Sequence, residues 1–169
     1  MKIDEELDKV RKLYEEARKD LKDFNNQVRE NKERMEEMKS KVNDKVKEFS
    51  HPANYKGALE YIFDYSLALK NESDFKLEDH FYYGLYHIMN QNNVDAKNSL
   101  DKITEKDKDE FNFYNHALFF KAIAIDDQPN YEDAITAYSQ VINLPGEDKE
   151  LKALKYLAWS NLGFTYLEI

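Results

Sequence analysis

After residue 50 the chain repeats one pattern of residue types every 38 positions. Each copy has an asparagine, an alanine four positions later, a large side chain four positions after that, and another large residue three positions further on. Residues three and four apart share one face of an α-helix, so each copy predicts an amphipathic helix with the asparagine at its N-cap. The copies are Asn54, Ala58, Ile62 and Tyr65; Asn92, Ala96, Leu100 and Ile103; and Asn130, Ala134, Tyr138 and Val141.

A second pattern, W-x-x-L-G-x-x-Y, consists of Trp159, Leu162, Gly163 and Tyr166. These four residues lie on one stripe of a helix, and the glycine allows a neighbouring helix to approach closely. Small residues also stand 12 positions before two of the repeated alanines, at Gly84 and Ala122. The same count from Ala58 reaches Val46, so we expect the helix that contains Val46 to end as the partner of the helix after Asn54.

The two patterns together resemble the tetratricopeptide repeat, a helix–turn–helix unit with a period of about 34 residues. The resemblance covers about residues 42–169 and implies an all-α fold, an α-solenoid whose last repeat is incomplete. It also implies a non-catalytic scaffold or adaptor that binds a helical or extended segment of another protein in a concave groove.

The residues before the repeats carry a heptad pattern that predicts one long helix over 3–49. Its seam residues are Ile3, Leu7, Val10, Tyr14, Ala17, Leu21, Phe24, Val28, Met35, Met38, Val42 and Phe49, with Asn31 and Lys45 as polar interruptions. A hairpin that turns at Asn25 and Asn26 is the alternative. We therefore predict two domains, a coiled-coil-like helix over 1–50 and a repeat domain over 51–169, with repeat helices near 54–70, 77–91, 93–104, 109–126, 130–143 and 148–169.

The charges beside the seam do not specify a parallel homodimer. Glu6 would attract Arg11 of a second chain, but Arg34 would repel Lys39. One flank is mainly basic, at Arg11, Arg18, Lys32 and Lys39, which favours an acidic partner helix or an acidic surface. An oligomer through residues 3–49, or a seam covered by the rest of the chain, are the alternatives.

The charge balance excludes several classes of partner. The net charge of −9 comes from residues 51–169, which have 11 lysines, no arginine and 20 acidic residues, whereas 14 basic and 14 acidic residues cancel over 1–50. Phosphate backbones and anionic membranes both attract basic surfaces, so we expect no nucleic-acid or membrane partner. The N-terminus has no signal-peptide pattern, and no window reaches the roughly 18 apolar residues of a membrane span, which predicts a cytoplasmic protein.

No motif in the sequence predicts chemistry. The chain has no cysteine, and His80 and His87 stand seven positions apart without further metal-ligand spacing, so we expect them to pack in the core. The acidic stretch around Asp126 lacks the glycine of a calcium loop. We expect no enzyme, no catalytic residue, no cofactor and no metal.

In the first helix of each repeat, the motif residues and the small residue face neighbouring helices. The other face of that helix is left for the concave side, where we predict the binding groove. We expect an amphipathic helix or an extended apolar peptide there, with basic residues that meet an acidic rim. The groove could instead be filled by the heptad helix or by a second copy, and a peptide-sensing regulator or an oligomerising spacer are the alternative functions. The predicted partner-binding residues are Phe81, Leu85, Ile88, Met89, Phe119, Ile123, Ser160, Phe164 and Leu167.

Overall fold

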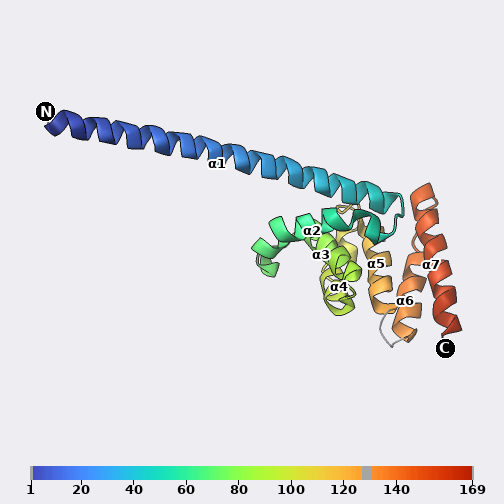
Figure 1. Ribbon diagram of the computed structural model, residues 1–169. Coiled ribbons are helices and arrows are strands. Elements are labelled where there is room, and N and C mark those ends of the chain that lie inside the picture. Colours follow the sequence, from blue (N-terminus) through green and yellow to red (C-terminus); the bar gives the residue numbers. More distant parts are fainter. Residues whose placement is uncertain (1, 127–130, 169) are drawn as a thin grey trace. The chain divides into compact units, whose positions relative to one another are not determined.

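The computed structural model describes residues 2–126 and 131–168. Every regular element in these ranges is helical, which confirms the predicted all-α class (Figure 1). The α-helices are α1 (Lys2–Lys47), α2 (Lys56–Tyr65), α3 (Leu77–Met89), α4 (Asn93–Leu100), α5 (Tyr114–Asp126), α6 (Tyr131–Ile142) and α7 (Lys149–Leu167). The short 3-10 segments are η1 (Pro52–Tyr55), η2 (Leu67–Leu69), η3 (Glu72–Asp74) and η4 (Glu105–Asp107).

The asparagines of the repeat do not act as predicted. Asn54 lies inside η1, because Pro52 starts a 3-10 turn and α2 begins only at Lys56. Asn92 is the N-cap residue of α4, but its side-chain amide donates to the Asp95 carboxylate at 2.6 Å and does not cap the backbone. Asn130 lies outside the described residues. The N-cap prediction is therefore wrong for Asn54 and correct only in position for Asn92.

Helix α1 is continuous over 46 residues, so the hairpin at Asn25 and Asn26 is excluded. Contacts divide the chain into two units, Met1–Glu37 and Met38–Ile169. We predicted a domain boundary after residue 50, whereas the last turns of α1 belong to the second unit. The reason is the burial of Val42 and Val46, whose side chains are 0% and 1% exposed.

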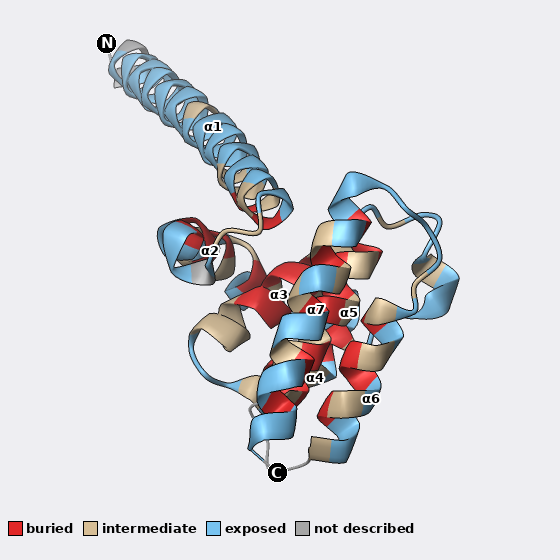
Figure 2. Ribbon diagram, turned by 90° about the vertical axis from the view of Figure 1, so that its right-hand side faces the viewer, coloured by how far each residue is buried: buried red, intermediate tan, exposed pale blue. Residues whose placement is uncertain are grey.

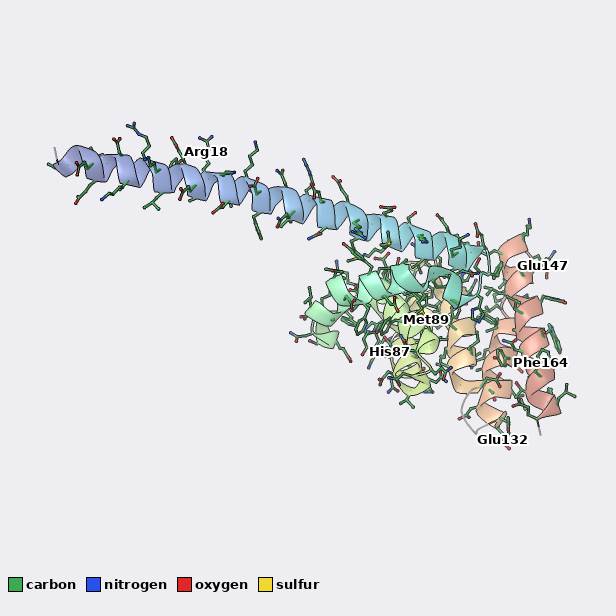
Figure 3. All side chains as sticks on the ribbon, viewed as in Figure 1. Arg18, His87, Met89, Glu132, Glu147 and Phe164 are labelled. Carbon is green, nitrogen blue, oxygen red and sulfur yellow. The ribbon has the colours of Figure 1, made fainter. Side chains whose placement is uncertain are left out.

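The first unit is a single helical segment with an exposed apolar seam. Most of its large seam residues are at least half exposed, and Arg18 on the same segment also points into solvent (Figure 3). A helix gains most of its stability in proteins from an apolar face that packs. The seam therefore needs a partner to contribute to stability. Its exposed members are Ile3, Leu7, Val10, Tyr14, Leu21, Phe24 and Val28.

In the second unit each helix from α2 to α7 packs against the next in sequence, and α5 also contacts α3 and α7. The buried residues concentrate on α3, α5 and the inner faces of α4 and α6 (Figure 2). The repeated alanines are buried as the spacing predicted, with Ala58 at 2% and Ala96 and Ala134 at 0% exposure. These small side chains allow consecutive helices to approach closely.

Polar contacts fix the end of α1 within this second unit. Lys39 forms an ion pair with Glu78 at 2.9 Å, and the Tyr82 hydroxyl donates to Asn43 at 3.0 Å. Lys39, which we predicted to belong to a basic flank facing an acidic partner or surface, pairs with an acidic residue of the same chain.

Candidate binding groove

An apolar cavity of about 350 Å³ opens among α3, α5, α7 and the C-terminal end of α1. Its size suits one large side chain or a short apolar segment of a ligand. The lining side chains come from four parts of the chain, and most of them are hydrophobic. They are Val46, Phe49, Ser50 and His51; Ile88; His116, Phe119, Phe120 and Ile123; and Leu154 and Leu157.

The structure brings three of the nine predicted groove residues together in this cavity. Ile88 from α3 and Phe119 and Ile123 from α5 form part of its wall. The one-turn spacing on α5 puts Phe119 and Ile123 on the same face. We refer to this site as the α3–α5–α7 cavity.

Two predicted residues belong to the core. Phe81 and Leu85 are 0% exposed, and the Phe81 ring stacks on Phe113 with centroids 5.2 Å apart. The prediction that they line an open groove is corrected, because α3 packs against α2, α4 and α5 and therefore has little free face. Met89, labelled in Figure 3, lies in the last turn of α3 and is half-buried. It is not part of the cavity wall.

The three predicted residues of α7 lie elsewhere. Ser160, Phe164 and Leu167 are exposed, and none of them lines the cavity. Figure 3 labels Phe164 on this helix. The helix turns its Leu154 and Leu157 toward the cavity instead. Eight of the nine residues that we predicted as one groove are therefore divided among a cavity, the core and a separate exposed face of α7, and Met89 lies half-buried at the end of α3.

The backbone turn after α1 places Phe49 in the cavity wall. Phe49 has φ 55°, and the N–H groups of Phe49 and Ser50 donate to the carbonyls of Val46 and Lys45, both at 3.0 Å. This is a Schellman C-cap, whose left-handed residue is usually glycine. A bulky side chain there carries a cost on the order of 1–3 kcal/mol, and such strained residues gather at functional sites.

His116 is the most deeply buried polar residue of the cavity wall. It is 2% exposed and stacks on Phe49 with ring centroids 5.8 Å apart. Burial, together with the charge of Lys47, lowers the pKa of His116 to about 4, so the imidazole is neutral near pH 7. Its Nε2 has no hydrogen-bond partner, and the Glu150 carboxylate lies 3.5 Å away. Nε2 is itself buried and points toward Glu150, which is not part of the cavity wall.

Sequence reasoning missed Phe49, His116 and Leu157. Phe49 was assigned to the coiled-coil seam, and only the left-handed turn turns it toward the cavity. Leu157 lies on the same helix as the W-x-x-L-G-x-x-Y motif but is not one of its residues. Nothing in the sequence around His116 indicates a buried nitrogen without a hydrogen-bond partner.

Groups suited to metal chemistry do not gather in the described parts of the chain. Within residues 2–126 and 131–168, no three His, Asp or Glu side chains are placed to hold a metal ion together. None of the helices described has the length and apolar character needed to cross a membrane.

No family model, no curated protein and no solved structure matches this chain. The likeness to the tetratricopeptide repeat therefore rests on the sequence patterns given above.

Proposed function

We propose that this chain is a non-catalytic protein-interaction scaffold of the tetratricopeptide type, which binds an apolar peptide segment at the α3–α5–α7 cavity. The observation that carries the proposal is the open apolar cavity, with Ile88, Phe119 and Ile123 in its wall. An apolar pocket of this kind holds a large anchoring side chain of a partner.

The charge of the second unit defines the rest of the ligand. Residues 38–169 have 22 acidic and 15 basic side chains, an excess of seven acidic ones, and Glu150 lies beside the cavity residue His116. A ligand with a large apolar anchor and flanking lysines or arginines would gain attraction to this surface. Binding should consequently weaken as the salt concentration rises.

The cavity can be tested with a random peptide library displayed on phage. We expect the selected peptides to contain a large apolar residue with basic neighbours. Ile123→Trp, which narrows the cavity without adding charge, should weaken their binding at least tenfold in titration calorimetry. The control is Val94→Trp on α4, an exposed position outside the cavity wall, which should leave the affinity unchanged. Equal affinity of both variants would contradict this location of the site.

A second candidate function, a peptide-sensing regulator, is favoured by the origin of the cavity wall. Val46 and Phe49 come from the C-terminal end of α1 and the turn that follows it. A bound peptide would contact the same helix that carries the exposed seam. Peptide binding would then change which conformations α1 populates, and so how it presents the seam to an effector protein.

The seam of residues 3–28 provides a second interaction element in this proposal, and its partner is a helix with an acidic flank. Arg11, Arg18 and Lys32 follow one side of the seam. Arg11 has an ion pair with Asp8 at 3.9 Å, but both side chains are at least 72% exposed, so the pair contributes little.

A designed helix can probe this element if it has leucine at the two apolar positions of each heptad, a and d, and glutamate at the positions beside them. We expect it to bind the full chain and Leu21→Asp to weaken binding at least tenfold, because a charge would enter the apolar contact. The matched control is Lys22→Asp, one position off the seam, which should reduce binding only slightly. If the probe fails to bind, or binds both variants equally, the seam is not used in this way.

A further inference from the structure

Helix α7 presents an apolar face that no described part of the chain covers. Its buried side faces the core with Leu154, Ala158 and Leu162. The rest of its circumference exposes large residues where a solvent-facing helix normally carries charged ones. Figure 2 shows exposed stretches along this helix. The large residues are Tyr156 at 74%, Trp159 at 60%, Phe164 at 65%, Tyr166 at 57% and Leu167 at 83% exposure.

The glycine in the middle of this face has space for a second helix. On α3, a Cβ added to Gly84 would lie 2.6 Å from the Leu100 side chain, because α4 packs closely at that point. On α7, a Cβ added to Gly163 would meet nothing within 4 Å. The two glycines hold corresponding places in the repeat, so the first is a filled helix-contact site and the second is an open one.

The charges on α7 indicate what kind of surface fits there. Residues 156–167 contain no charged side chain, although charged residues make up 35% of the whole chain. The nearest lysines are already engaged, Lys152 with Glu147 at 3.2 Å and Lys155 with the Gly146 carbonyl at 3.2 Å. An uncharged apolar face offers nothing to a charged partner and pairs best with another uncharged face.

The exposed face of α7 is also complementary to itself. When two copies of a helix cross antiparallel about a two-fold axis, a residue of one copy meets the residue of the other copy that lies equally far from the crossing point in the opposite direction along the sequence. With the centre between Asn161 and Leu162, small residues meet at the middle and large residues meet on both sides. The matched pairs of an antiparallel contact are Ser160 with Gly163, Trp159 with Phe164, and Tyr156 with Leu167.

We propose that two copies of this chain associate through an antiparallel α7–α7 contact centred on Ser160 and Gly163. Close approach at these small residues lets the flanking aromatic side chains of both copies pack around the crossing. This inference concerns a surface separate from the α3–α5–α7 cavity and does not depend on the proposed peptide binding.

The absence of cysteine from the chain allows a direct test of the contact. Ser160→Cys and Gly163→Cys chains are mixed and oxidised, and a disulfide forms readily only between Cα atoms about 4.4–6.8 Å apart. We expect the mixed dimer to form at least ten times faster than dimers of Val94→Cys, an exposed control on α4. Cross-linking no faster than this control overturns the proposal. Faster linking of each variant to itself than to the other also overturns it, because that indicates a parallel contact.

Sedimentation velocity of the full chain gives an independent readout. The wild-type chain should sediment as a dimer, and Trp159→Lys should sediment as a monomer. Its far-ultraviolet spectrum should be unchanged, because Trp159 is 60% exposed. Leu21→Asp, on the seam of α1, should leave the dimer intact. A monomeric wild type, a dimer that survives Trp159→Lys, or a dimer lost in Leu21→Asp overturns the α7 contact.

Discussion

Phe81→Ser should lower the free energy of unfolding by about 3–5 kcal/mol, the usual cost of emptying a fully buried aromatic site. The Phe81 side chain is 0% exposed and contacts Phe111, Phe113 and Phe120 within a cluster of rings. Replacement leaves a void among these rings and buries a hydroxyl group. Chemical denaturation followed by circular dichroism measures the loss.

The matched control is Phe164→Ser, the same substitution at a residue that is 65% exposed. In dilute solution, where self-association does not contribute, it should change the free energy of unfolding by less than about 0.5 kcal/mol. Similar losses in the two variants would mean that α3 does not occupy the centre of the second unit.

Acid should destabilise the fold between pH 6.5 and pH 4, by up to about 3 kcal/mol from His116 alone. The unfolded chain binds a proton at His116 near its ordinary pKa of 6.5, whereas burial lowers the folded pKa to about 4. The contribution is complete above pH 6.5 and is lost as the pH falls toward 4. Burial lowers the pKa of His80 and His87 as well, so they act in the same direction.

His116→Phe isolates this effect, since an aromatic ring of similar size can still pack between Phe49 and Phe113. The variant should lose most of the pH dependence between 6.5 and 4 in denaturation measurements at several pH values. Asp79 does not interfere in this range. Burial would raise its pKa, but hydrogen bonds from Lys70 and the Lys76 backbone outweigh burial and lower it from 3.8. Identical pH profiles of the two proteins would show that His116 is not buried in neutral form.

The sequence predicted the all-α class and the close helix contacts through periodicity, and the repeated alanines show why. Ala96 and Ala134 must be small because helices cross closely at these points, and both are completely buried. The continuous heptad likewise predicted the unbroken helix α1, since no glycine or proline interrupts it. Local turns were less predictable, because Pro52 moves the start of α2 past Asn54.

The candidate site was predictable only in part, because burial depends on what packs on both sides of a helix. Phe119 and Phe81 look alike in the sequence, yet one lines the cavity and the other lies in the core. Phe49 reached the cavity through a left-handed backbone conformation that glycine usually adopts. A sequence pattern does not indicate that a phenylalanine will adopt this left-handed conformation after a helix.

Hydrogen–deuterium exchange of the full chain, with and without a peptide selected from the phage library, tests the proposed binding function most directly. The account predicts slower exchange in 46–51, 116–123 and 154–157, which form most of the cavity wall. A change in residues 3–37 as well would favour the peptide-sensing regulator. Unchanged exchange at the cavity, with protection confined to other helices, would contradict binding at the α3–α5–α7 cavity.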